Sequence, residues 1–230
     1  MNAAKAARDW KGVLAWEGRL EELLEGLAGP RGCSDATCEG ILAVFCTAHV
    51  EMHHKDNARA AIGLLERRVE LLGKMERFRD QGQRICEIAY CLECLGREEE
   101  ARKEFQRARD VGAAHGFFSV ECLACVGLGH LAMTVGRDEE GVELYQNAVA
   151  AARVSGDGDI SLSQERSILC MLIEALFETK AIDEVEPHLL RYREMVKAES
   201  QSNFPYVPAE LKAEVISARL HEVPRIRIPM

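Results

Sequence analysis

Apolar residues recur at three- and four-residue spacing along most of the chain, and short stretches of turn-forming residues separate these periodic segments. Such spacing places the apolar side chains on one face of a helix. The pattern predicts an all-α protein of about ten helices, expected near residues 3–27, 36–54, 57–75, 80–95, 98–114, 118–135, 138–154, 162–180, 183–199 and 207–221.

One segment of the chain recurs after forty residues. Gly96–Ala101, GREEEA, returns as Gly136–Gly141, GRDEEG, and Phe105 falls on Tyr145 at the same offset. Looser copies lie forty residues earlier and forty-four residues later. Each unit is predicted to be two amphipathic helices joined by a tight turn.

Small residues at matched positions are expected to let the two helices of a unit approach closely, while Phe105 or Tyr145 fills the space beside them. The matched small residues are Ala89 and Ala101 in one unit and Gly129 and Gly141 in the next.

This order of a small residue, a turn glycine, and then alanine, an aromatic residue and alanine resembles the tetratricopeptide repeat, over roughly residues 35–200. The forty-residue unit is similar to the longer variety found in kinesin light chains, Leu-Gly-Asn repeat adaptors and bacterial Rap regulators. HEAT repeats share the length but do not predict the small–aromatic–small stripe. The first unit departs by placing His49 at a small-residue position, and the last lacks its turn glycine and carries Pro187 early in its second helix.

The resemblance implies an α-solenoid of stacked antiparallel helix pairs. Four hairpins would form one continuous solenoid over residues 35–200. Residues 1–34 would supply an N-terminal helix and loop, and 201–222 a capping helix. The extended tail, 223–230, would fill the groove of the solenoid or dock elsewhere.

In such a stack the first helix of each hairpin lines a concave groove. Helical spacing then identifies which side chains of these first helices face the groove. The selected residues are Ala43, Cys46, Val50, His53, Gln83, Cys86, Tyr90, Glu93, Leu123, Val126, His130, Met133, Ser167, Cys170, Glu174 and Phe177. This set contains no Lys or Arg, so it lacks the basic residues with which tetratricopeptide co-chaperones grip a carboxylate. A mostly apolar wall with glutamates suits an amphipathic helix or a peptide with basic flanks.

Composition narrows the classes of partner. The formal net charge of −9 opposes nucleic acid, which binds to clustered basic faces. No apolar run approaches the roughly 18–20 residues that span a bilayer, so membrane insertion is not expected. Nine cysteines, an odd number in a chain of 230 residues, indicate reduced thiols in the cytoplasm.

Two Cys-x-x-Cys pairs, Cys91 with Cys94 and Cys122 with Cys125, raise the possibility of a zinc site. The pairs fall late in one first helix and early in the next. About twelve residues of helix, or about 18 Å, would separate them. A shared metal is therefore not expected.

Other candidate chemistry is incomplete. His49 and His53 lie one helical turn apart without a further ligand nearby in sequence, and Asp157–Asp159 lacks the glycine and glutamate of a calcium loop. The chain has no nucleophile elbow or phosphate-binding glycine loop. We therefore expect no catalytic residue, metal or cofactor.

Three functions remain open at this point. The first is an adaptor or scaffold that binds a peptide or helix of a partner protein in the groove. The second is a structural subunit of a larger assembly, for example cytoskeletal or ciliary, that uses its convex and end surfaces. The third is a ligand-responsive regulator of an enzyme or transcription factor.

Overall fold

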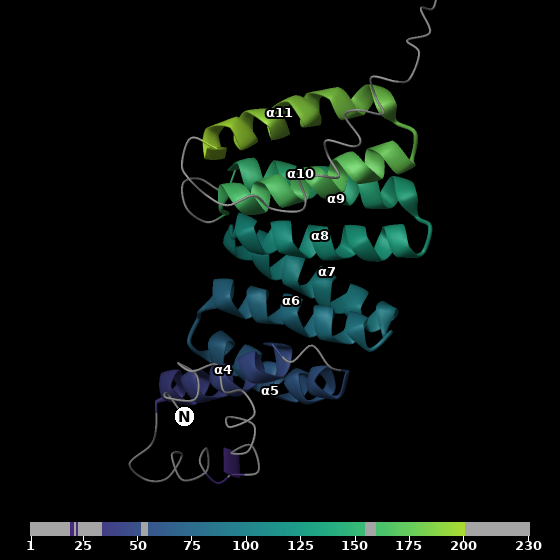
Figure 1. Ribbon diagram of the computed structural model, residues 1–230. Helices are drawn as coiled ribbons and strands as arrows, with labels where there is room; N and C mark the ends of the chain where they lie inside the picture. Colours follow the sequence, from purple (N-terminus) through teal and green to yellow (C-terminus); the bar gives the residue numbers. More distant parts are fainter. Residues whose placement is uncertain (1–18, 21, 23–33, 52–54, 155–159, 201–230) are drawn as a thin grey trace, which may run out of the picture. The chain divides into compact units, whose positions relative to one another are not determined.

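The computed structural model describes residues 19, 20, 22, 34–51, 55–154 and 160–200. Within these ranges the regular elements are eight α-helices, and no strand occurs (Figure 1). The helices are α4 (Asp35–Glu51), α5 (Lys55–Lys74), α6 (Phe78–Cys94), α7 (Glu98–His115), α8 (Phe118–Thr134), α9 (Asp138–Val154), α10 (Leu162–Glu178) and α11 (Ile182–Ser200).

These eight helices confirm the all-α prediction, with ends within about three residues of those expected from the sequence. Two predicted helices remain. The helix expected at 207–221 lies outside the described residues, and of the helix expected at 3–27 only residues 19, 20 and 22 are described. The helices pair in chain order as α4 with α5, α6 with α7, α8 with α9, and α10 with α11.

The chain divides into two compact units, residues 1–127 and 128–230, with the boundary inside α8. In the first unit α5 packs against α4 and α6, and α6 packs against α7. In the second unit α10 packs against both α9 and α11. The prediction that all four hairpins form one continuous solenoid stays a prediction.

Tight turns within the hairpins depend on one residue in the left-handed conformation. Gly96 and Gly136 adopt φ of 73° and 72°, as the repeated glycine predicts. Glu76 and Lys180 hold the equivalent places in the first and last hairpins, with φ of 57° and 61°. The missing glycine therefore leaves the turn in place, at the cost of strain that glycine would avoid.

All four turns close with the same backbone hydrogen bond, in which the residue after the left-handed one donates to a carbonyl five residues back. The pairs are Arg77 to Leu72, Arg97 to Leu92, Arg137 to Ala132 and Ala181 to Leu176, each 2.9 Å long.

Helix α11 continues through Pro187. A capping box opens α10, because Ser161 Oγ accepts from the Gln164 amide at 3.2 Å and the Gln164 side chain accepts from the Ser161 amide at 2.8 Å.

The small residues meet where the repeat predicts. A methyl group added at Gly129 would lie 3.3 Å from the carbonyl oxygen of Gly141 and 2.9 Å from the ring of Tyr145, which is only 4% exposed. The backbones of α8 and α9 therefore approach as closely as glycine allows, with the aromatic ring beside them.

Phe105 reaches further than the repeat pattern predicts. Its side chain is fully buried, and a methyl group added at Gly127 would lie 2.3 Å from its ring. Gly127 belongs to α8, the first helix of the next hairpin, so Phe105 joins two hairpins as well as filling its own. Phe105 also contacts the ring of Tyr90. The two rings meet at 77°, with their centroids 4.9 Å apart.

Candidate partner-binding surface

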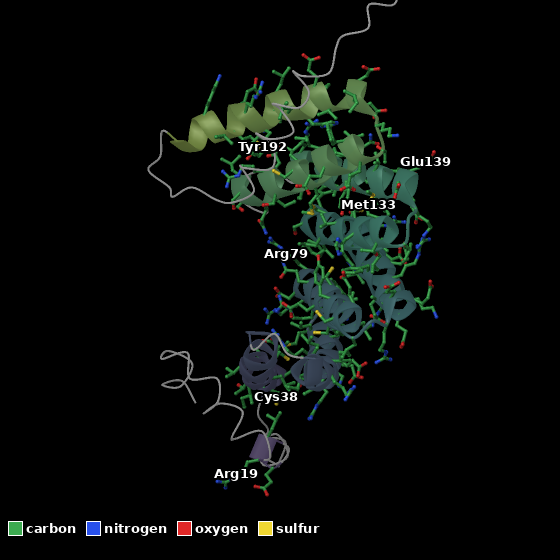
Figure 2. The ribbon with its side chains drawn as sticks, turned by 45° about the vertical axis from the view of Figure 1, so that its right-hand side comes forward. Arg19, Cys38, Arg79, Met133, Glu139 and Tyr192 are labelled. Atoms are coloured by element: carbon green, nitrogen blue, oxygen red, sulfur yellow. The ribbon has the colours of Figure 1, made fainter. Side chains whose placement is uncertain are left out.

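Helix α8 carries a single charged residue, Glu121, in a protein whose residues are 29% charged. All of its predicted groove positions are at least partly exposed to solvent. The side chains of Leu123, Val126 and Met133 are half-buried, and that of His130 is exposed. Met133 extends over α9, where its sulfur would lie 2.5 Å from a methyl group added at Gly141 (Figure 2).

Helix α6 presents a slightly different set from the one expected. Gln83 and Glu93 are half-buried, and Tyr90 is 37% exposed, but Cys86 is buried. The next residue, Glu87, is the one that reaches the surface, four residues after Gln83. Sequence spacing did not select Glu87, although it lies on the same helical stripe as Gln83 and Tyr90.

The other predicted cysteines behave like Cys86. Cys46 on α4 and Cys170 on α10 are both buried, so the recurring thiols belong to the interior and we leave them out of the candidate surface. Other predicted positions are accessible, with Ala43, Glu174 and Phe177 half-buried and Ser167 exposed. The side chains of Val50 and His53 lie outside the described residues.

Helices α6 and α8 are neighbours in the first unit, and their buried sides pack closely. A methyl group added at Gly82 would lie 2.5 Å from Val120 Cγ1, so the two helices approach closely at that point. Further along, Tyr90 contacts Phe105, whose ring rests on the backbone at Gly127. We call the accessible residues of these two neighbouring helices the α6–α8 surface; they are Gln83, Glu87, Tyr90, Leu123 and Val126.

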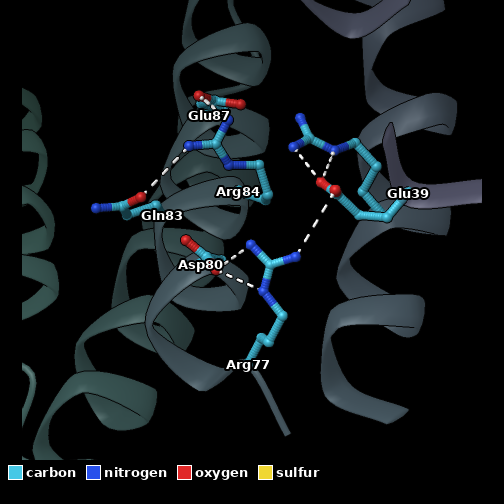
Figure 3. Close-up of polar contacts among 7 residues, drawn as sticks. Glu39, Arg77, Asp80, Gln83, Arg84 and Glu87 are labelled. Atoms are coloured by element: carbon cyan, nitrogen blue, oxygen red, sulfur yellow. Dashed lines mark hydrogen bonds and ion pairs between the residues drawn. The ribbon is translucent and has the colours of Figure 1, made fainter. Parts of the chain in front are cut away.

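Glu87 is the acidic group of this surface. Its carboxylate lies 2.8 Å from Arg84 Nη1, and Arg84 also reaches Gln83 at 3.5 Å (Figure 3). Burial raises the pKa of Glu87, against the opposing effects of Arg84 and Arg68. A cation delivered by a partner would therefore improve the solvation of this carboxylate.

A buried ion pair stabilises the hairpin on which α6 packs. Arg68 of α5 donates to Glu39 of α4 through Nε at 3.0 Å and Nη2 at 2.5 Å, and the two side chains are only 9% and 12% exposed. Arg77, just before α6, lies 3.8 Å from the other Glu39 oxygen and pairs with Asp80 (Figure 3). Glu39 thus links three helices.

Of the candidate metal sites, the structure describes only the two Cys-x-x-Cys pairs. Among the described residues, no group of three or more His, Cys, Asp or Glu side chains is arranged to hold a metal ion. Cys91, Cys122 and Cys125 are buried, whereas Cys94 is exposed in the last turn of α6. The side chains of His49 and His53 and the Asp157–Asp159 loop lie outside the described residues.

Burial makes several thiols poor nucleophiles. It raises the pKa of Cys46, Cys86 and Cys122 to about 12 and that of Cys91 to about 11, and it also raises the pKa of Cys125. At pH 8 a thiol of pKa 12 is about 0.01% thiolate.

Alkylation of the folded protein at pH 8 is therefore expected to modify Cys94 and the half-buried Cys38 quickly, and the buried thiols only after denaturation. Mass spectrometry of the alkylated peptides measures this order. Labelling of Cys46 or Cys86 as fast as Cys94 would contradict the buried positions.

No helix in the described part of the chain combines the length and apolar character needed to cross a bilayer. No family model matches the chain. No curated protein matches it in sequence.

Solved structures resemble the chain in fold. BtubC (BKLC) from P. vanneervenii superposes with a TM-score of 0.68 at 12% identity, covering 90% of this chain and 80% of that one. The apo form of RapI gives 0.66 at 8% identity, covering 96% and 81%. TPR-like repeats of a putative kinesin light chain from Podosopora anserina give 0.58 at 16% identity, covering 80% and 87%. The chain has paired helices, left-handed turns and aromatic rings packed against glycine residues. Together with the structural matches, these features identify the tetratricopeptide-type helical repeat fold.

Proposed function

We propose that the protein is a non-catalytic adaptor that binds a segment of a partner protein on the α6–α8 surface. The observation that carries this proposal is the uncharged accessible side of α8. Leu123 and Val126 are half-buried apolar residues on a helix with one charge, and Tyr90 on the neighbouring helix α6 is exposed. An apolar patch with one aromatic residue at its edge is a common arrangement for peptide recognition.

The partner segment is expected to be apolar with basic residues beside it. Leu123 and Val126 offer contact area to aliphatic side chains, and Glu87 offers a carboxylate to Lys or Arg. An amphipathic helix or an extended strand with a basic edge meets both requirements. The acidic composition of the chain opposes nucleic acid as the partner.

The state of the cysteines supports a reducing compartment as the place of action. None of the eight described cysteines forms a disulfide, and most of them pack in the interior as apolar residues. We place the protein in the cytoplasm on this ground.

Truncation of Tyr90 tests the proposal. With the protein as bait, the Tyr90→Ala variant is expected to bind its partner about 30-fold more weakly, the effect of losing about 2 kcal/mol at an interface. Affinity capture from a cell extract, followed by titration of the recovered protein, measures the loss.

Phe118→Ala is the matched control, because Phe118 is also 37% exposed but stands at the start of α8, beside the buried side of that helix. Its binding should equal that of the unaltered protein. Both variants must retain the helical circular dichroism of the parent. Undiminished recovery by the folded Tyr90→Ala variant would overturn the proposal.

A further inference from the structure

His188 lies on α11 near the place where this helix meets α9. Gln146 of α9 donates a hydrogen bond to the carboxylate of Glu184 at 3.3 Å, and His188 follows Glu184 by one helical turn. The imidazole is half-buried. Its Nδ1 atom is shielded from solvent and has no hydrogen-bond partner among the described residues.

The neutral and the charged imidazole differ in what this environment costs them. A neutral ring can carry its hydrogen on Nε2 and leave Nδ1 bare, whereas an imidazolium carries N–H groups at both nitrogens. Protonation of His188 in the packed helix would therefore bury a charged N–H group that has no acceptor beside it. The packed arrangement is built for the neutral form.

Two charged side chains act on this imidazole. Arg153, in the last turn of α9, opposes protonation of His188, and Glu184 favours it. Burial, which has the largest effect, acts together with Arg153 and outweighs Glu184, so the pKa of His188 is lowered from its ordinary value.

Helix α10 packs against both α9 and α11, but its charges are directed elsewhere. Glu165 pairs with Arg191 of α11 at 3.3 Å. In the described part of the chain, the influences on His188 come from Arg153 and Glu184 rather than from the charged residues of α10, which are Glu165, Arg166, Glu174 and Glu178. The protonation state of His188 therefore depends on its burial and on one ion of each sign.

Acid favours a conformation in which α11 has moved away from α9. The exposed imidazole would regain the ordinary histidine pKa of about 6.5, so the opened form binds more protons than the packed form. The packing is then at full strength above about pH 6.5 and weakens as the pH falls below it. A protonated His188 would also attract Glu184 and compete with Gln146 for its carboxylate.

We propose that His188 is a pH-sensitive switch, and that its protonation loosens α11 from α9. The residues that carry this inference all belong to the unit 128–230, whereas the α6–α8 surface consists of residues of the unit 1–127. The inference therefore does not depend on the adaptor function, and each of the two proposals can fail without the other.

Hydrogen exchange of the full chain, followed by mass spectrometry at pH 7.5 and pH 5.5, tests the switch. After correction for the intrinsic exchange rate at each pH, the protection of α11 peptides is expected to fall at least threefold on acidification, relative to peptides of α7. This interval covers the titration of an ordinary histidine and lies above that of ordinary carboxyl groups.

Substitutions identify the groups responsible. His188→Gln keeps a polar side chain that does not titrate, so α11 should lose its response to pH. Arg153→Gln removes the cation that opposes protonation and should weaken the response. Arg137→Gln is the matched control, because Arg137 stands just before the other end of α9 and pairs with Glu140 at 3.1 Å; it should leave the response unchanged.

Equal protection of α11 at the two pH values would overturn the inference, and so would a response that persists in a folded His188→Gln variant. If circular dichroism shows that His188→Gln does not fold, Arg153→Gln decides the question, because Arg153 is exposed and its loss leaves the core intact. A response as large as that of the parent would then contradict the switch. A nuclear magnetic resonance titration in which His188 protonates at or above pH 6.5 would contradict it as well.

Discussion

Replacing Phe105 with alanine is expected to lower the free energy of unfolding by about 3–5 kcal/mol. The side chain is fully buried, touches the ring of Tyr90 and rests on the backbone at Gly127. Truncation therefore removes apolar contacts both within its own hairpin and with the next one. Because Gly127 has no side chain to move into the space, the cavity would be filled poorly. Urea denaturation followed by circular dichroism measures the loss.

Val154→Ala serves as the control for this experiment, because Val154 is 61% exposed at the end of α9. Its effect should stay within about 0.5 kcal/mol. A loss of less than 1 kcal/mol for Phe105→Ala, with an unchanged denaturant slope, would contradict the buried position of the ring.

Replacing Glu39 with alanine is expected to cost about 3–5 kcal/mol as well, for an electrostatic reason. The substitution would leave Arg68 charged and only 9% exposed, without the carboxylate that receives two of its N–H groups. Arg77 would lose a charge partner at the same time. Chemical denaturation at neutral pH measures this cost.

The double substitution Glu39→Met with Arg68→Met separates the charge from the packing. Because it removes both members of the pair and keeps apolar volume, it should be much less destabilising than Glu39→Ala alone. If the single variant were no less stable than the double variant, the desolvated charge would not be the cause of the loss.

The hairpins could be predicted from the sequence because their signals are local. A period of three to four residues identifies the helices, and Gly96 and Gly136 identify the turns forty residues apart. The last hairpin shows why a missing glycine does not exclude a turn. Lys180 adopts the left-handed conformation, and packing of α10 against α11 offsets the modest cost.

Which residues of a helix are exposed was harder to predict, because this depends on small differences in their angular position around the helix axis. Cys86 lies inside the predicted stripe, whereas Glu87 lies just outside it, about 40° beyond Gln83 around α6. In the structure the small apolar thiol packs inward and the carboxylate stays near water. The difference in polarity between the two side chains favours exposure of Glu87, whereas helical spacing alone favours Cys86.

Contacts between distant segments carry no local signal. Glu39 and Arg68 are 29 residues apart, and neither stands in a recognisable motif. The contact of Phe105 with Gly127 joins different hairpins, whereas the repeat pattern predicts only the contacts inside one. A single sequence shows that Gly127 is small but not which ring requires it to be small.

A double-mutant cycle of Gly127→Ala and Phe105→Leu tests most directly whether an aromatic ring seated on glycine joins successive hairpins. In the parent protein, Gly127→Ala is expected to cost about 1–3 kcal/mol, because the added methyl group would overlap the ring. In the Phe105→Leu background the smaller, more adaptable side chain should relieve at least about 1 kcal/mol of that cost. Additive effects, within about 0.3–0.5 kcal/mol, would show that the two residues do not meet and would contradict this packing.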